Sequence, residues 1–209
     1  MKERPIIFSA PMVRAILSGT KTQARRIVKP QPDLVVDGKP CIKSMDDMRY
    51  GRLAKVLPCP FGATGDKLWG RESGWERPER TPHMMREGAD TWARYYYDAD
   101  DFTEIEREQF KKWGFIRRPS IHMPRWASRL TLEVVSARVE RVQDISEADA
   151  IAEGIVYSKA WDGFGDIDGR YFHCTDSRRS YEHLWDHIHG PASWDANPWV
   201  WVIEFRRIA

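Results

Sequence analysis

The sequence predicts an α+β protein that is built as a mixed β-barrel, with short flanking helices and long inserted loops. The first observation is that short stretches of alternating apolar and polar residues, which are typical of strands, occur between short segments of helical periodicity. The second is that long segments with many prolines or charges and little periodicity separate these elements. A doubly wound sheet would need regularly alternating strands and helices, and no glycine-rich dinucleotide or P-loop motif is present.

The chain length favours one domain. At 209 residues the chain can bury a substantial core and is near the usual size of a single domain. We expect one domain over residues 1–209, with insertions at about 30–60, 75–120 and 156–195. The first insertion carries a hairpin signal at Asp37-Gly38.

The N-terminal segment predicts a strand, a helix and a second strand. Residues 6–8 form an apolar strand signal, and residues 11–17 follow with an apolar helical face. Ser9 is a suitable N-cap, and Gly19 ends the helix. The polar segment 21–28 then leads into a short strand. Chemistry is expected where that helix ends.

Further elements follow along the chain. The longest strand signal covers residues 128–142, and its alternation slips once near Val134-Val135, which indicates a β-bulge or a barrel corner. Ser146 opens a capping-box pattern into a helix that Gly154 ends. The remaining expected elements are strands at 67–72, 95–97 and 199–205, helices at 102–113 and 177–189, and a loop at 161–169.

Charge and composition limit the classes of partner. The formal net charge of +2 excludes a protein that binds nucleic acid as a whole-molecule polycation. Any nucleic-acid site must therefore be a local patch. Most of the ten tryptophans are expected in the core or at its rim, and a minority are available to stack on bases.

Cysteine usage and hydropathy indicate a cytoplasmic protein. Three cysteines without a CxxC pair argue against a disulfide framework and against a four-cysteine zinc site. No apolar run is long enough to span a bilayer, and residues 1–10 lack the pattern of a signal peptide. We expect free thiols and no membrane partner.

An ordered set of motifs resembles the ASCH family. The set consists of Gly19-x-Lys21-x-x-x-x-Arg26, of Gly65-Asp66 opening a strand, of a helix after the long strand, and of a terminal Val-Ile-Glu-Phe strand. The resemblance covers about half of the chain and implies the PUA-like barrel used by RNA-modifying enzymes. Segments 65–72 and 120–129 are similar to a longer branch of the family found in phages and prophages.

The resemblance also implies functional residues. Small N4-acetylcytidine amidohydrolases of this family use a lysine, a threonine and a glutamate, which correspond here to Lys21, Ala24 and Glu153. Alanine has no hydroxyl to attack an acyl carbon, so the covalent mechanism does not transfer intact. Thr20 and Thr22 are close in sequence, but a hydroxyl displaced by several ångströms loses most of its rate, since about 1 Å already costs about 100-fold. Other family members resemble ribonucleases that act on single-stranded RNA.

Three residues near the motif admit alternatives. Lys21 is a general base if burial and nearby arginines lower its pKa, or a phosphate-binding cation, or an exposed lysine. Arg26 clamps a phosphate or pairs with Glu153 or Glu72. Glu153 precedes a helix-ending glycine, where a carboxylate opposes the helix dipole, so it is either strained for a purpose or merely exposed.

The loop at 120–129 is a second candidate region. His122 is placed for acid–base catalysis, and the arginines and tryptophan of the loop suit phosphate contact and base stacking. A rim loop with a capping histidine is the alternative. The residues expected to bind nucleic acid are Lys21, Arg25, Arg26, Arg71, Arg125, Trp126 and Arg129.

No metal or cofactor is expected. The pair His183 and His187 lies at helical spacing, but no H-E-x-x-H glutamate accompanies it, and a helix surface is the favoured interpretation. Asp166 and Asp168 lack the glutamate at the twelfth position of a calcium loop, so we expect a turn there.

The sequence leaves two function classes open. One is an RNA-processing hydrolase, either a ribonuclease or an amidohydrolase of modified cytidine, with Lys21, Arg26, Glu153 and His122 around one cleft. The other is a non-catalytic reader of RNA or of a modified DNA base. The missing hydroxyl at Ala24 favours a ribonuclease or a reader over a deacetylase.

Overall fold

The computed structural model of the chain describes residues 2–43, 55–77, 79, 85, 86, 88 and 93–208, without the side chains of residues 171–174. Parts of the first two predicted insertions, at 44–54 and within 78–92, lie outside these residues. The described residues form the predicted α+β structure, with one five-stranded sheet and three sheets of three strands. None of the helices in this part of the chain is both long and apolar enough to cross a membrane.

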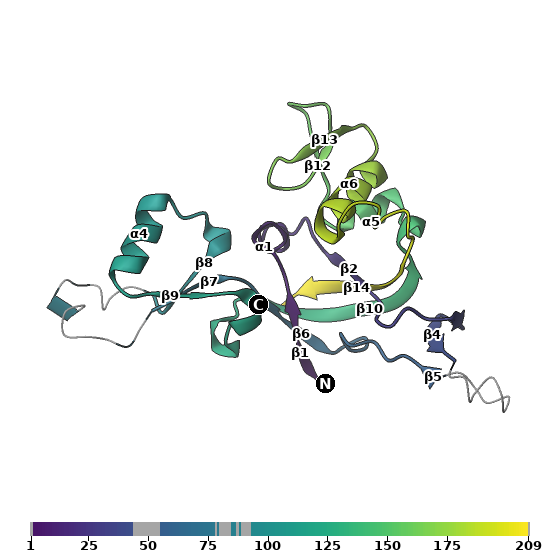
Figure 1. Cartoon of the computed structure of the whole chain (residues 1–209), viewed down its shortest axis with the longest axis horizontal. Helices are drawn as coiled ribbons and strands as arrows, with labels where there is room; N and C mark the ends of the chain where they lie inside the picture. The colour runs from purple at the N-terminus through teal and green to yellow at the C-terminus, as the bar shows by residue number, and fades with distance from the viewer. Residues whose placement is uncertain are drawn as a thin grey trace.

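The five-stranded sheet forms the centre of the molecule (Figure 1). Its strands, in spatial order, are β1 (Glu3–Ile7), β6 (Lys67–Arg71), β10 (Thr131–Arg141), β14 (Trp199–Arg207) and β2 (Gln23–Ile27). β1 runs parallel to β6, and all other neighbours are antiparallel. β1 and β2 share no strand pairing, so the sheet is open in the described residues.

The predicted phase slip in the long strand is confirmed. The pairing of β10 with β14 shifts between Val134 and Ser136, which leaves Val135 as an extra residue. Leu132 and Val134 are buried before this bulge, and Val139 packs against the same core after it. The bulge therefore keeps one apolar face on both halves of the strand.

Strand β14 is buried on both faces because its apolar residues are continuous. Val200 and Val202 pack beneath α5 (Glu147–Ala152) and α6 (Ser177–His189), which lie together on one side of the sheet (Figure 1). Ile203 belongs to the core on the opposite face, together with residues of α1 (Ala10–Leu17). β14 therefore contributes to both cores.

Most elements expected from the sequence are confirmed. The structure contains the capping box at the start of α5, where the Ser146 hydroxyl accepts from Asp149 N at 3.1 Å. The predicted turn at 37–38 joins β3 (Leu34–Val36) and β4 (Lys39–Ile42). The other confirmed elements are β8 (Tyr95–Tyr97), α4 (Glu104–Lys112) and α6.

Several short strands were not expected. They are β5 (Lys55–Val56), β7 (Gly74–Glu76), β9 (Ile116–Arg118), β11 (Val156–Ser158), β12 (Gly163–Gly165) and β13 (Tyr171–Cys174). The loop predicted at 161–169 is therefore wrong where β12 lies. Strands of two to four residues are too short to show periodicity, and their partners fix them instead.

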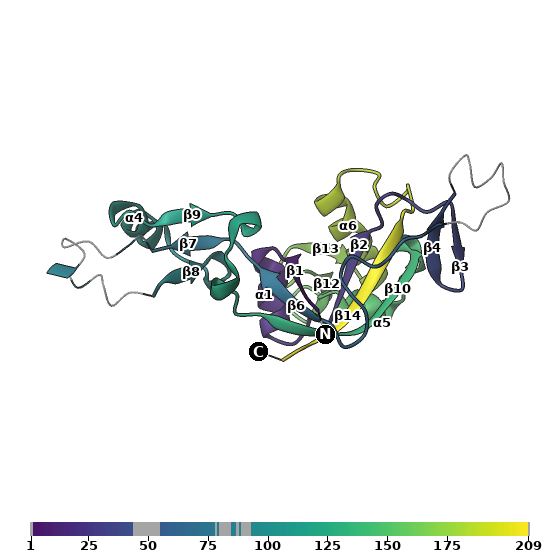
Figure 2. The ribbon, with the colours of Figure 1, turned by 90° about the horizontal axis from the view of Figure 1, so that it is seen from below.

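Two small units flank the central sheet at opposite ends (Figure 2). At one end, β7, β8 and β9 form a sheet covered by α4, and an aromatic cluster that includes Trp75, Phe110 and Phe115 packs between them. At the other end lies the sheet of β3, β4 and β5. Neither unit contributes to the cavity described below.

Candidate functional site

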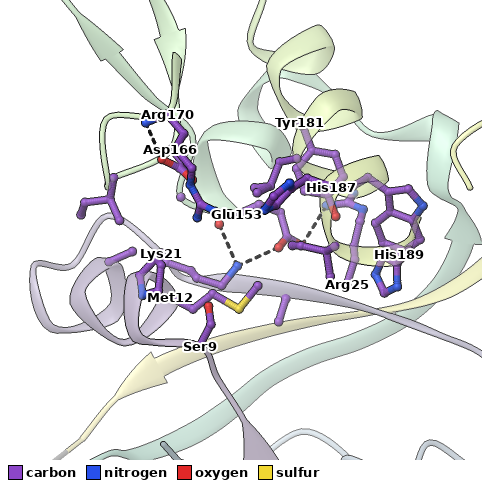
Figure 3. Close-up of a pocket in the computed structure, with 18 of the residues that line it drawn as sticks. Ser9, Met12, Lys21, Arg25, Glu153, Asp166, Arg170, Tyr181, His187 and His189 are labelled. Atoms are coloured by element: carbon purple, nitrogen blue, oxygen red, sulfur yellow. Dashed lines mark hydrogen bonds and ion pairs between the residues drawn. The ribbon is translucent and has the colours of Figure 1, made fainter. Parts of the chain in front are cut away.

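A cavity of about 460 Å³ lies between α1, β2, the end of α5 and α6. Figure 3 shows its polar side chains, which come from segments far apart in the sequence. The lining residues that matter for its chemistry are Ser9, Lys21, Ala24, Arg25, Arg26, Glu153, Tyr181, Trp185, His187 and His189.

Lys21 is buried at the base of this cavity, with 3% of its surface exposed. Gly19 ends α1 with φ at +80°, and the next turn brings the Lys21 N–H within 3.0 Å of Ala15 O. The Lys21 ammonium donates to Glu153 O at 2.7 Å and to Glu153 Oε2 at 2.8 Å. The interpretation of Lys21 as an exposed lysine is therefore wrong.

Glu153 is neither exposed nor unpaired, because it lies at the C-cap of α5 with 7% of its surface exposed. A carboxylate there opposes the helix dipole, but the Lys21 ammonium contacts both the carboxylate and the terminal carbonyl of Glu153. Gly154 adopts φ of +102°, and a Cβ there would lie 3.5 Å from the Cβ atoms of Ala15 and Lys21. These are ordinary van der Waals distances, so the positive φ, and not a lack of space, favours glycine at the end of α5.

Arg25 holds the acidic side of the site together. Its guanidinium lies 3.3 Å from Glu153 Oε1 and 3.3 Å from Asp149 Oδ2, and it also pairs with Glu140. Its side chain is buried, and its Nε makes no hydrogen bond to the described residues. Three carboxylates thus compensate the charge of this one guanidinium. Arg25 therefore positions the acidic side chains of the site and is not available to bind a phosphate.

Burial lowers the pKa of Lys21. Desolvation of the ammonium is the largest cause, and the nearby charges of Arg26 and Arg25 act in the same direction, while Glu153 opposes them. This is the direction that a lysine needs if it is to lose a proton and act as a base.

Arg26 is the cation of the cavity that lacks a carboxylate partner among the described residues. Its guanidinium is half-buried, donates to Ile7 O and lies 5.6 Å from the centre of the Phe8 ring. Glu153 pairs with Lys21 and Arg25, and Glu72 pairs with Arg129. The predicted ion pairs of Arg26 are therefore absent from the described residues, and its charge faces the cavity.

Two polar groups of α6 lie in the cavity wall without hydrogen-bond partners among the described residues. Tyr181 is 4% exposed and its hydroxyl makes no such bond, and the indole N–H of Trp185 is also unpaired. Burial raises the pKa of Tyr181 well above its usual value, with Glu153 acting in the same direction. Tyr181 therefore stays protonated and can donate to a ligand.

Two histidines of α6 contact other side chains of the cavity wall. His187 lies 3.1 Å from the Arg170 guanidinium, and the His189 ring lies 4.1 Å from the Trp185 ring. No group of three potential metal ligands occurs in the described part of the chain. Asp166 accepts from the N–H groups of Asp168 and Arg170, which is the predicted turn.

The hydroxyl groups of Thr20 and Thr22, next to Lys21 in sequence, do not take the place of the hydroxyl that is missing at Ala24. Ala24 is buried in β2 opposite Ile203 and lines the cavity. The Thr20 hydroxyl donates to Ala15 O at 3.1 Å, and Thr22 is exposed, and neither lines the cavity.

The second candidate region lies apart from this cavity. None of its predicted residues, His122, Arg71, Arg125, Trp126 and Arg129, is among those that line the cavity. The loop folds into two short 3₁₀ turns, Ser120–His122 and Arg125–Ala127, and His122 is exposed. The single cleft expected around Lys21 and His122 does not form.

Most cations of this second region are already compensated. Arg125 pairs with Glu3 at 2.6 Å, and Arg129 pairs with Glu72 at 3.0 Å and with Asp100 at 2.7 Å. The guanidinium of Arg71 donates to a backbone carbonyl, and Trp126 remains 45% exposed under the guanidinium of Arg94. These contacts are those of a well-ordered surface.

Sequence reasoning missed Tyr181, Trp185 and Ser9 as cavity residues. Tyr181, Trp185 and His189 follow one another at four-residue spacing, which places them on one face of α6. The sequence shows this spacing, but it does not show which part of the protein this face of α6 packs against.

Comparisons with protein-family models, with curated proteins and with solved structures found no match to this chain.

Proposed function

We propose that this chain is a hydrolase that binds an acylated cytidine, free or within RNA, in the Lys21 cavity and removes its acyl group. The observation that carries the proposal is the buried Lys21 ammonium held by Glu153 on the wall of a cavity of about 460 Å³. Burying a lysine ammonium costs free energy of folding. Lysines whose pKa is lowered by burial are typical of sites that transfer protons.

The size and lining of the cavity support a ligand of nucleoside size. Small-molecule sites usually measure about 300–1,000 Å³ and combine aromatic walls with a few unpaired polar groups. Tyr181 and Trp185 provide aromatic surface and hydrogen-bond donors without partners among the described residues. Arg26 provides a positive charge free to bind a phosphate of a nucleotide.

The proposed chemistry assigns a role to each polar group. Lys21 accepts a proton in its neutral form, and Glu153 positions its amine. Tyr181 donates to the acyl oxygen as negative charge develops there, which is the usual work of an oxyanion donor. Arg25 holds the Glu153 carboxylate in place.

We also propose that the open five-stranded sheet corresponds to a PUA-like barrel of the ASCH type. The Arg26 side chain donates to Ile7 O, so a side chain bridges the gap between the edge strands β2 and β1. The order of motifs along the chain supports the same assignment.

A non-catalytic reader is the second candidate, and one observation favours it. Ala24 lines the cavity at the position where the resembling amidohydrolases have their nucleophile. A ribonuclease is less well supported, because His122 does not line this cavity, and the histidines that do line it, His187 and His189, contact Arg170 and Trp185.

Turnover of defined substrates tests these alternatives. The protein and its Lys21→Met variant are incubated separately with N4-acetylcytidine and with labelled single-stranded RNA. We expect cytidine and acetate from the first substrate and loss of that activity in Lys21→Met. Binding without turnover would support the reader, and RNA cleavage that persists in Lys21→Met would contradict the proposed site.

A further inference from the structure

Ser9 has the one serine or threonine hydroxyl that lines the cavity in the described part of the chain. It occupies the N-cap of α1 with an extended backbone, as predicted, but its side chain makes no capping hydrogen bond. Its hydroxyl makes no other hydrogen bond to the described residues. The hydroxyl is therefore free to react or to bind.

The Ser9 hydroxyl points toward the Lys21 side chain (Figure 3). The Lys21 amine is fixed on its other side by Glu153 O at 2.7 Å and Glu153 Oε2 at 2.8 Å. A free hydroxyl and a buried amine thus face the same space. A hydroxyl, an amine base and a carboxylate that orients the base are the groups that acyl transfer needs, and a bound substrate would have to bring the hydroxyl and the amine into hydrogen-bond contact.

The surroundings of Ser9 also favour negative charge. Ser9 lies at the N-terminus of an eight-residue helix, where the helix dipole stabilises an anion. Independently, Tyr181 is 4% exposed and lines the same cavity with a hydroxyl that has no described partner. The helix N-terminus and the Tyr181 hydroxyl are thus two groups in the wall of this cavity that favour negative charge on a ligand.

We propose that Ser9 is the nucleophile of this site and replaces the hydroxyl that Ala24 lacks. This rests on the proposed function, because it names the residue that attacks the acyl group of the ligand. Ser9 Oγ forms a bond to the acyl carbon while its proton passes to the neutral Lys21 amine. The bond between the acyl carbon and N4 of the cytosine breaks, and the proton held by Lys21 passes to this leaving amine. Water then hydrolyses the acyl-serine ester, which releases a carboxylic acid and restores Ser9.

The test traps the acyl group on the intact chain. The protein is mixed with p-nitrophenyl acetate, quenched in acid and digested, and mass spectrometry locates the acetylated peptide. The variants are Ser9→Ala, Ser9→Cys and Lys21→Met. Ser18→Ala is the matched control, because the Ser18 hydroxyl lies at the other end of α1, donates to Ala15 O at 3.1 Å and does not line the cavity.

We expect acetyl on Ser9 in the unmodified protein and in Ser18→Ala, acetyl on the new thiol in Ser9→Cys, and none at this position in Ser9→Ala or Lys21→Met. Turnover of N4-acetylcytidine should fall about 1,000-fold or more in Ser9→Ala. Acetylation elsewhere, or undiminished turnover in Ser9→Ala, would overturn the role of Ser9. If Lys21→Met is inactive while Ser9→Ala keeps its turnover, the proposed function holds and the role of Ser9 is wrong. If N4-acetylcytidine is not hydrolysed while Ser9 still becomes acetylated, the proposed substrate is wrong and Ser9 remains the nucleophile.

Discussion

The ion pair between Lys21 and Glu153 links parts of the chain 132 residues apart. Burying both charges costs several kcal/mol per ion before any attraction is counted, so a hydrophobic pair would serve stability as well or better. A contribution to folding stability therefore does not explain the buried pair, and the proposed proton transfer by Lys21 does.

Glu153→Gln should destabilise the protein by about 3–5 kcal/mol, because it leaves the buried Lys21 ammonium without a charge partner. Denaturant unfolding followed by circular dichroism measures the change. The matched control is Glu133→Gln, which breaks a surface pair with Arg206 and should cost about 0–1 kcal/mol. Equal losses in the two variants would mean that the buried pair has no special energetic role.

The pH dependence of turnover should report Lys21. A lysine that must be neutral to accept a proton gives a rate that is low at acidic pH and rises as the lysine deprotonates. Because burial lowers the pKa of Lys21, kcat/KM for N4-acetylcytidine should rise to a plateau with a midpoint below the ordinary lysine value of 10.5. A profile without this rise would exclude Lys21 as the base.

Restoring the missing hydroxyl is a further residue-scale test. Ala24 is 2% exposed and lines the cavity, so Ala24→Thr adds a hydroxyl next to Lys21 with a small increase in volume. In the Ser9→Ala background, this substitution should raise deacetylation of N4-acetylcytidine above that of Ser9→Ala alone. A folded double variant with no gain would show that the resemblance at this position does not extend to chemistry.

The sequence predicted half of this site. Lys21, Arg25 and Arg26 lie in a short motif, and Glu153 came from the resemblance to the ASCH amidohydrolases. Tyr181 carries no local signal, since it becomes a neighbour of Lys21 only when α6 packs over β14. Ser9 was predicted as the N-cap of α1, and nothing in its local sequence shows that it lines a cavity. The burial of Lys21 was likewise invisible, because it depends on the end of α5.

At the scale of elements, the bulge in β10 sets which side chains face the core. Before it, Leu132 and Val134 point inward, and after it the inward residues include Val139, so the phase changes at Val135. This was predictable because a strand of eleven residues shows its periodicity. The strands of three residues, such as β7 and β12, showed none.

Deleting Val135 should cost less than about 2 kcal/mol, because removal of the extra residue leaves Ala137 and Val139 on the same face as Val134 and keeps their pairing with β14. The deletion variant is compared with Val135→Thr in thermal and denaturant unfolding. Val135 is 47% exposed, so the substitution should change stability by less than about 0.5 kcal/mol. A loss of more than about 3 kcal/mol on deletion alone would show that Val135 is not an extra residue that the strand can lose without changing its register.

In the whole molecule, two regions that contain arginines are candidate ligand sites. The region around Arg125 and Arg129 lies outside the cavity, and carboxylates already pair with both residues. The Lys21 cavity contains Arg26, which has no carboxylate partner among the described residues. Uncompensated charge beside an enclosed space favours the cavity as the place where an anionic ligand binds.

The most direct test of this claim is the affinity for N4-acetylcytidine 5′-monophosphate, measured by calorimetry for the unmodified protein and for two matched arginine variants. Arg26→Ala should weaken binding by about tenfold or more, because it removes a charged hydrogen-bond donor from the cavity. Arg125→Ala should leave the affinity unchanged, since Arg125 pairs with Glu3 away from the cavity. Full affinity in Arg26→Ala, with loss in Arg125→Ala, would contradict the assignment of the ligand site to the Lys21 cavity.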